Sequence, residues 1–436
     1  MTEIENAKGT RDLLPEQKIL RNEIAKTIVQ VFEKYGFDPI ETPALERFET
    51  LSSKFAGGEE IMKEIFSLTD QGNRKLGLRY DLTVPLARII AQNPNIKMPF
   101  KRYQIANVWR DGPIKLGRYR EFTQCDADVV GSSSKLVDAE LLAIANEVFE
   151  KLDLKVIIKI NSIKVLNEIC KQAEIKNTQD AILTLDKLEK IGEQEVKKEL
   201  KEKNYSEKQI KELLSLFSIS GKNEEILKNI MGEGKEELNE IIKYTKEFGL
   251  KNVQIVPSLA RGLSYYTGTI FEVYLETSEA KKIGITGSLA AGGRYDNMIG
   301  KFTGREAQTP AIGISFGLDV IFDALSKKLE AEKGELKIKK SNVKVYVIPI
   351  GIEKEKIGEV INIVNKLRQA NINTDFDLSE KGRGVSKNLD YASKKAIPFA
   401  LIVGSDELKS KKLTLRNMIT GKEEKLQIEK IISLLS

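Results

Sequence analysis

Two strand-like segments joined by a polar turn, between residues 100 and 130, limit most strongly how this chain can fold. The first runs from Arg102 to Trp109 and the second from Glu121 to Val130. Asp111, Gly112 and Pro113 stand just after the first strand, and these residue types favour a turn. The pattern therefore predicts a long hairpin, which also carries most of the unusual residues of the chain.

The first three quarters of the chain mix helical and strand-like patterns. Leu20, Ile24 and Ile28 lie at helical spacing and predict an amphipathic helix over residues 16–35. Residues 165–250 are rich in Lys and Glu and keep apolar residues at helical spacing, which predicts an inserted helical domain. The other elements expected here are extended residues 37–43, strands at 76–80, 271–275 and 311–316, and a helix at 318–325.

A Lys-rich stretch with few core residues, 326–342, is typical of a linker. Beyond it strands and helices alternate, which predicts a compact α/β domain over residues 343–436. Its expected elements are strands at 343–350, 372–376 and 399–403 and helices at 353–370 and 387–395. The predicted divisions of the chain are 1–164 with 251–325, then 165–250, 326–342 and 343–436.

Composition excludes several classes of protein. Charged residues make up 31% and hydrophobic residues 41% of the 436 residues, with 11 Pro, which excludes collagen-like, membrane and disordered chains. Cys125 and Cys170 are too few for a disulfide framework, and residues 1–14 lack the apolar run of a signal peptide. We therefore expect a cytoplasmic protein. The net charge of +6 is too small to identify a polyanionic partner.

The chain contains no histidine, and this restricts its chemistry. No imidazole can act as a general base or bind zinc, and a Ser-His-Asp triad is impossible. Any reaction must therefore depend on carboxylates, arginines, tyrosines and the backbone.

Three segments carry residues suited to a charged ligand. Residues 108–124 place four cations around the hairpin turn, where guanidinium groups suit phosphate oxygens and aromatic rings suit a stacked base. Residues 259–268 combine an arginine, two glycines and two tyrosines before a strand. Residues 290–296 hold a glycine pair without the lysine of a phosphate-binding loop or the spacing of a dinucleotide loop. An exposed basic tip and a turn with core aromatics are the alternatives for the first two.

Taken together, these segments resemble the histidyl-tRNA synthetase family, a class II aminoacyl-tRNA synthetase family, over nearly the whole chain. Residues 8–12 (KGTRD) are similar to its N-terminal signature and residues 78–83 (LRYDLT) to the loop that holds the amino group of histidine. The other similar segments are 41–43 at the end of motif 1, 110–128 in motif 2, 261–266 and 292–296 in the histidine-specific motifs, and 375–378 and 413–417 in the anticodon-binding domain.

The resemblance implies an α+β class II catalytic domain, in which helices flank an antiparallel sheet, with a helical insertion and a C-terminal α/β anticodon-binding domain. It implies that the protein activates histidine with ATP and Mg²⁺ and transfers it to the 3′ end of tRNA(His). The implied partners are histidine, ATP, tRNA(His) and a second copy of the chain, with no membrane. It assigns no side-chain ligands to a metal.

The resemblance also implies roles for individual residues. Arg110 and Arg261 are implied as catalytic, because guanidinium groups at the α-phosphate offset the charge that develops when the substrate carboxylate attacks. A carboxylate is already a nucleophile, so this step needs no general base. The residues implied for histidine binding are Asp81, Thr83, Arg110, Gln124, Asp128, Arg261, Tyr265, Tyr266 and Tyr295. Those implied for ATP binding are Arg110, Arg118, Tyr119, Phe122 and Arg261.

Two positions depart from the family pattern. Ser264 stands where Asp is common, and Val320 stands where motif 3 usually has an arginine. Loss of that guanidinium predicts ATP binding that is weaker by about 1–2 kcal/mol.

Two alternatives to the enzyme follow from the same pattern. The first is a noncatalytic paralogue, such as the regulatory subunit of ATP phosphoribosyltransferase, and the second is a tRNA-binding scaffold without activation chemistry. The terminal α/β domain and the retained Arg110 and Arg261 argue against the first. Asp128 and Tyr266 argue against the second.

Overall fold

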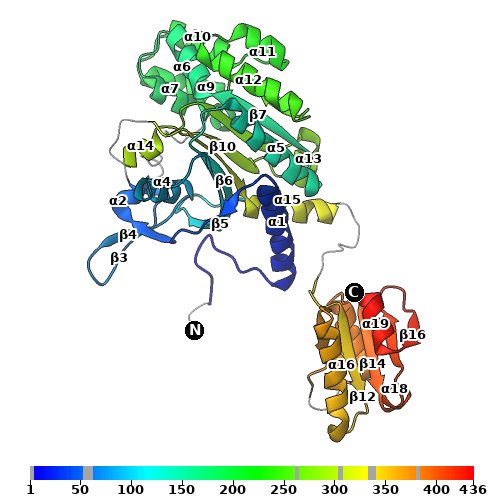
Figure 1. The fold of residues 1–436 in the computed structure, drawn as a ribbon. Helices are drawn as coiled ribbons and strands as arrows, with labels where there is room; N and C mark the ends of the chain where they lie inside the picture. Colours follow the sequence, from blue (N-terminus) through cyan, green and yellow to red (C-terminus); the bar gives the residue numbers. More distant parts are fainter. Residues whose placement is uncertain (1–3, 53–61, 261–264, 303–307, 332–339, 380–382) are drawn as a thin grey trace. The chain divides into compact units, whose positions relative to one another are not determined.

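The computed structural model describes residues 4–52, 62–260, 265–302, 308–331, 340–379 and 383–436 (Figure 1). Contacts within the chain define two compact units: Met1–Arg11 with Glu23–Gly334, and Asp12–Asn22 with Glu335–Ser436. None of the described helices combines the length and the apolar character that crossing a membrane requires.

The first unit is built around a mixed sheet in the order β1-β5-β6-β11-β10-β9-β7-β8. The expected hairpin is its longest pair, with β5 and β6 antiparallel and Trp109 opposite Glu121. Among the described strands of this sheet, only the outermost pairs, β1 with β5 and β7 with β8, are parallel. The strands are β1 (Asp38–Pro39), β5 (Phe100–Trp109), β6 (Glu121–Val130), β11 (Ala311–Gly317), β10 (Ala290–Arg294), β9 (Thr269–Leu275), β7 (Val156–Ser162) and β8 (Val253–Ile255).

Helices cover both faces of this sheet, as expected for a domain in which helices flank a sheet. Phe316 of β11 packs against Phe32 of α1 and Phe149 of α5, with ring centroids 5.7 Å apart in each case. On the other face, α4 and α14 pack together around Leu86 and Met298. The helices are α1 (Pro15–Lys34), α2 (Phe48–Leu51), α4 (Thr83–Gln92), α5 (Lys135–Lys151), α13 (Thr277–Ile283), α14 (Met298–Phe302) and α15 (Leu318–Ala331). A small sheet joins β2 (Leu45–Arg47), β4 (Lys75–Leu78) and β3 (Ser67–Thr69).

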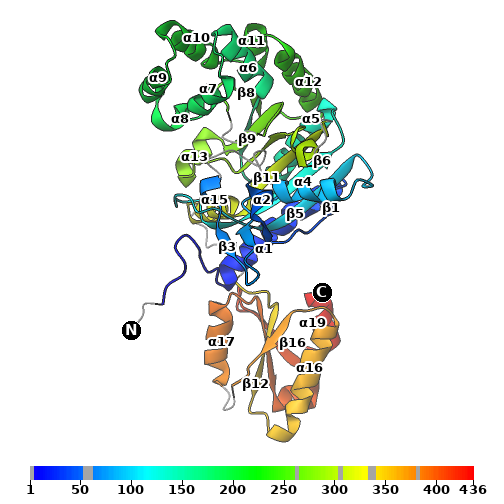
Figure 2. The ribbon, with the colours of Figure 1, turned by 90° about the vertical axis from the view of Figure 1, so that its left-hand side faces the viewer.

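The predicted helical insertion is present between β7 and β8, and Figures 1 and 2 show its helices gathered at the end of the sheet that these strands form. Ser162 and Ser206 cap two of the helices by accepting from backbone N–H groups, as expected for N-cap residues. Since α12 packs against α5, the insertion belongs to the same compact unit as the sheet. The helices are α6 (Ile163–Gln172), α7 (Thr178–Leu185), α8 (Leu188–Ile191), α9 (Glu193–Glu202), α10 (Glu207–Phe217), α11 (Asn223–Asn229) and α12 (Glu233–Glu247).

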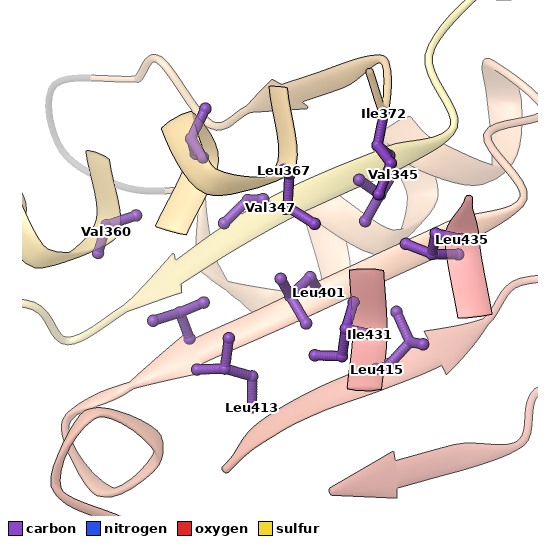
Figure 3. Close-up of a cluster of buried hydrophobic side chains, with 12 residues drawn as sticks. Val345, Val347, Val360, Leu367, Ile372, Leu401, Leu413, Leu415, Ile431 and Leu435 are labelled. Carbon is purple, nitrogen blue, oxygen red and sulfur yellow. The ribbon is translucent and has the colours of Figure 1, made fainter. Parts of the chain in front are cut away.

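The second unit contains a separate sheet in the order β13-β12-β14-β15-β16. Figure 3 shows its core, in which Val347 and Leu401 of the central strands meet Leu367 of α16 and Ile431 of α19. Its strands are β12 (Val345–Ile350), β13 (Thr374–Phe376), β14 (Phe399–Gly404), β15 (Leu413–Asn417) and β16 (Glu423–Leu426). Its helices are η1 (Lys354–Lys356), α16 (Ile357–Gln369), α17 (Gly384–Lys394), α18 (Ser405–Ser410) and α19 (Ile428–Leu435).

The predicted linker begins too early. We expected a helix to end at Leu325, but α15 continues to Ala331. Lysine is a good helix former, and Lys328 also pairs with Asp153 at 2.8 Å and with Glu279 at 3.4 Å. The lysine that suggested a linker therefore belongs to a helix, and its charge is paired with carboxylates that are distant in the sequence.

Candidate active site

A cavity of about 700 Å³ lies over the face of the sheet that carries the even-numbered side chains of β6. It collects all the predicted site residues that the structure describes. These are Asp81, Thr83, Arg110, Arg118, Tyr119, Phe122, Gln124, Asp128, Tyr265, Tyr266 and Tyr295. Arg261 and Ser264 lie outside the described residues, so the structure says nothing of their positions.

Glycines on the neighbouring strands make room for the functional side chains. Gly313 of β11 stands opposite Asp128 of β6, and a Cβ atom at Gly313 would lie 1.9 Å from Asp128 Oδ1. A Cβ at Gly293 would lie 2.8 Å from Cδ1 of Tyr266. The glycines therefore let a carboxylate and an aromatic ring lie directly against the sheet.

Asp128 is held at one end of the cavity by one hydrogen bond and one ion pair, both buried. The Tyr295 hydroxyl donates to its Oδ1 at 2.6 Å, and Arg102 Nη2 lies 2.6 Å from its Oδ2. Burial raises the pKa of Asp128, while the Arg102 charge and the Tyr295 hydrogen bond oppose that rise. The Tyr265 ring packs against Tyr266, with centroids 4.7 Å apart. A carboxylate beside aromatic rings suits a small planar ligand with an N–H donor.

Asp81 and Arg110 are held side by side through their neighbours in the chain. Asp81 Oδ1 accepts from the Val84 N–H in the first turn of α4, and Arg110 Nε donates to the carbonyl of Tyr80 at 3.0 Å. Burial raises the pKa of Asp81 to about 6, although the Arg110 charge lowers it. The Arg110 guanidinium also lies 5.2 Å from the centre of the Phe122 ring. The cation of Arg110 and the aromatic ring of Phe122 thus lie next to each other in the lining of the cavity.

Beyond Phe122 the tip of the hairpin lines the cavity. Arg118 is half-exposed and pairs with Glu64 at 3.3 Å. Val320 fits between two glycines: its Cγ2 lies 3.0 Å from a Cβ placed on Gly117, and its Cγ1 lies 2.8 Å from one placed on Gly317. The wall at Val320 is therefore aliphatic and tightly packed.

Comparison with known proteins agrees with this geometry. Residues 9–321 match the family model for histidyl-tRNA synthetase, and residues 344–436 match the model for an anticodon binding domain. The chain belongs to the histidyl-tRNA synthetase family. It is 43% identical over 440 residues to histidine–tRNA ligase 1 of Bacillus cereus, covering 99% of each chain.

Solved structures show the same relationship at the level of the fold. A histidyl-tRNA synthetase from Nostoc sp. PCC 7120 matches with a TM-score of 0.82 and 32% identity over 100% of this chain and 99% of that one. An ATP phosphoribosyltransferase regulatory subunit/histidyl-tRNA synthetase from Bacillus halodurans C matches with a TM-score of 0.73 over 93% of this chain and 98% of that one. At 22% identity the second match shows the fold alone.

Arg11 is a residue of this synthetase fold to which the sequence analysis gave no role. Its guanidinium donates to Asp319 at 2.8 Å, to Asp323 at 2.9 Å and to the Tyr119 hydroxyl at 2.9 Å. Asp319 in turn accepts from the Thr123 N–H at 2.7 Å. Arg11 therefore ties the N-terminal signature to α15 and to the hairpin. Asp319 and Asp323 are four residues apart on one helix, and this spacing was the available signal.

Replacing Arg11 by methionine is expected to lower the free energy of unfolding of the first unit by about 1–3 kcal/mol. The substitution leaves the buried Asp319 and Asp323 carboxylates without their cation. Chemical denaturation followed by tryptophan fluorescence measures the change, and Arg11→Lys, which keeps the charge, should recover part of it. Equal stability of the wild type and Arg11→Met would contradict this role for Arg11.

Several other residues that line the cavity were not predicted. Glu64, Asp186 and Glu272 contribute carboxylates, and Ser315 and Asp126 lie on the central strands. Asp126 could have been found, because Gln124, Asp126 and Asp128 alternate along a predicted strand and must share one face. The others come from segments whose approach to the cavity depends on the tertiary fold.

Proposed function

We propose that the protein is a histidine–tRNA ligase. The observation that carries the proposal is one cavity with a buried carboxylate among aromatic rings at one end and Arg110 with Phe122 at the other. The first end suits the imidazole of histidine, and the second suits a phosphate and a stacked base. The similarity to histidine–tRNA ligases over 99% of the chain supports the same activity.

The proposed reaction has two steps. The carboxylate of histidine attacks the α-phosphorus of ATP, forming histidyl-adenylate as the bond to the leaving pyrophosphate breaks. A ribose hydroxyl of the terminal adenosine of tRNA(His) then attacks the carbonyl carbon and releases AMP. In the first step Arg110, and Arg261 by resemblance, offset the charge that develops on the α-phosphate. Asp128, Tyr266 and Tyr295 hold the imidazole ring, which positions the carboxylate for attack.

Mg²⁺ is proposed to enter with ATP. The part of the chain that the structure describes has no group of three or more Asp, Glu, His or Cys side chains placed to hold a metal. This fits Mg²⁺, which commonly binds through substrate phosphates and one or two carboxylates. Glu64 and Glu272 line the cavity and are the side chains we propose for that contact. Mg²⁺ there would neutralise charge on the phosphates.

We also propose a cytoplasmic homodimer, as the family resemblance implies. Leu45 of β2 and Leu68 of β3 are exposed on the two outer strands of the small sheet, on either side of β4, and such apolar side chains support contact with a second copy. The regulatory paralogue remains the alternative function. It is less well supported, because the cavity retains Arg110 and the relative with 43% identity is named as a ligase.

Histidine-dependent exchange between ATP and labelled pyrophosphate tests the proposed function. We expect the purified chain with Mg²⁺ to catalyse exchange with histidine and not with other amino acids. A site that hydrogen-bonds an imidazole rejects apolar analogues of similar size, because its buried polar groups would then lose their partners. Exchange that depends on a different amino acid would overturn the assignment, and histidine binding without exchange would favour the regulatory paralogue.

A further inference from the structure

Asp126 lies in the floor of the cavity, on β6 between Gln124 and Asp128. Its side chain is buried, with 3% of the residue exposed, yet it lines the cavity. Ser315 lies close enough to stabilise its carboxylate, and Ser315 Oγ accepts from Gln124 Nε2 at 2.8 Å. Asp126 Oδ1 has no hydrogen-bond partner among the described residues.

The charges around Asp126 are incompletely balanced. Asp81, Asp126 and Asp128 are all buried at this part of the cavity, and Arg102 lies against Asp128 at 2.6 Å. The described chain shows no ion pair to Asp126, although the Arg102 charge acts on it from a greater distance. A buried carboxylate without a direct counter-ion is costly. A cationic group of a ligand would remove that cost.

Two further oxygens in the same cavity complement the same kind of ligand. Asp81 Oδ2 and Gln124 Oε1 are buried and, like Asp126 Oδ1, have no hydrogen-bond partner within the described residues. All three are acceptors. An ammonium group offers three N–H donors and no acceptor, which matches a set of three acceptor oxygens. A neutral imidazole has one N–H donor and does not match this set.

We infer that Asp126 is a substrate-binding residue that accepts a hydrogen bond from the α-ammonium group of the amino acid, together with Asp81 and Gln124. This inference rests on the proposed function and adds a residue to it. Asp126 makes the site select amino acids over analogues that lack the amino group, whereas Asp128 binds the imidazole ring. The two carboxylates stand two residues apart on one strand and serve opposite ends of the same ligand.

Asp126→Asn tests this assignment, because asparagine keeps the size of the side chain and an acceptor for Ser315 but removes the charge. Binding of histidine and of imidazole-4-propionate, which lacks the amino group, is measured by calorimetry, with the weaker ligand measured by displacement. In Asp126→Asn we expect the affinity for histidine to fall roughly 10- to 100-fold relative to the wild type. The affinity for imidazole-4-propionate should stay within about two-fold. Asp128→Asn is the matched control and should weaken both ligands.

A second measurement separates binding from a structural role. Burial raises the pKa of Asp126 in the free protein, so the folded state holds its proton more tightly than the unfolded state. Asp126 therefore destabilises the ligand-free fold as pH rises through the raised pKa, and has little effect near the unfolded value of about 4. Asp126→Asn should raise the melting temperature without histidine by about 2 °C or more at pH 8, and less at pH 5.

Each outcome decides between the two proposals. Unchanged histidine affinity in Asp126→Asn, or an equal loss for both ligands, would overturn the ammonium contact while the ligase assignment stands. A lower melting temperature at pH 8 would show that Asp126 supports the fold instead. Failure of the wild-type protein to bind histidine would overturn the proposed function itself.

Discussion

Gly313→Ala is expected to reduce histidine binding at least roughly 100-fold while the sheet stays folded. A Cβ atom at this position would lie 1.9 Å from Asp128 Oδ1, so the carboxylate must move. Movement breaks its contacts with the Tyr295 hydroxyl and with Arg102, each 2.6 Å long. Separating a buried ion pair costs about 3–5 kcal/mol, and the ring-binding end of the cavity loses its acceptor. The exchange rate as a function of histidine concentration measures the effect.

Gly287→Ala provides a matched control for this substitution. Gly287 also lines the cavity, but a Cβ placed there would meet nothing within 4 Å. We expect its Michaelis constant for histidine to stay within about two-fold of the wild type. A normal Michaelis constant in Gly313→Ala, or equal losses in both variants, would show that contact with Asp128 is not what requires glycine at 313.

Arg110→Ala is expected to slow formation of the adenylate on the order of 100- to 1000-fold, because it removes a preorganised charge from the transition state. The guanidinium is already oriented by the Tyr80 carbonyl at 3.0 Å and lies over the Phe122 ring. Single-turnover measurement with saturating histidine and ATP separates this step from binding. Arg110→Lys should recover little, since an ammonium cannot reproduce the planar fork.

Arg118→Ala is the comparison for that experiment. Arg118 belongs to the same hairpin but is half-exposed and paired with Glu64, so we expect roughly a ten-fold rise in the Michaelis constant for ATP and little change in the single-turnover rate. If Arg110→Ala changes only the melting temperature, then Arg110 supports the fold and another group carries the chemistry.

Local patterns predicted the elements that carry the site. The hairpin was placed within two residues of β5 and β6, because its apolar strands and polar turn are encoded in consecutive residues. The predicted end of α15 was wrong, because the last turns of this helix are stabilised by Asp153 and Glu279, which are distant in sequence. The resemblance of the motifs assigned individual residues between positions 81 and 295 to one site, and the structure places those that it describes around one cavity.

The contacts that could not be predicted from the sequence depend on how segments that are distant in the chain pair with one another. Gly313 gains its importance from standing opposite Asp128, a pairing between β6 and β11 that no local pattern contains. Arg11 likewise acquires its partners 308 and 312 residues further along the chain. Single residues can be recognised from a motif, but the atoms that they contact require the fold.

The close fit of Val320 between Gly117 and Gly317 has a consequence for engineering nucleotide affinity at this position. The space around the valine is already filled, so a longer side chain at residue 320 needs the hairpin tip to withdraw. Position 320 and the hairpin tip therefore have to be redesigned together, as one unit.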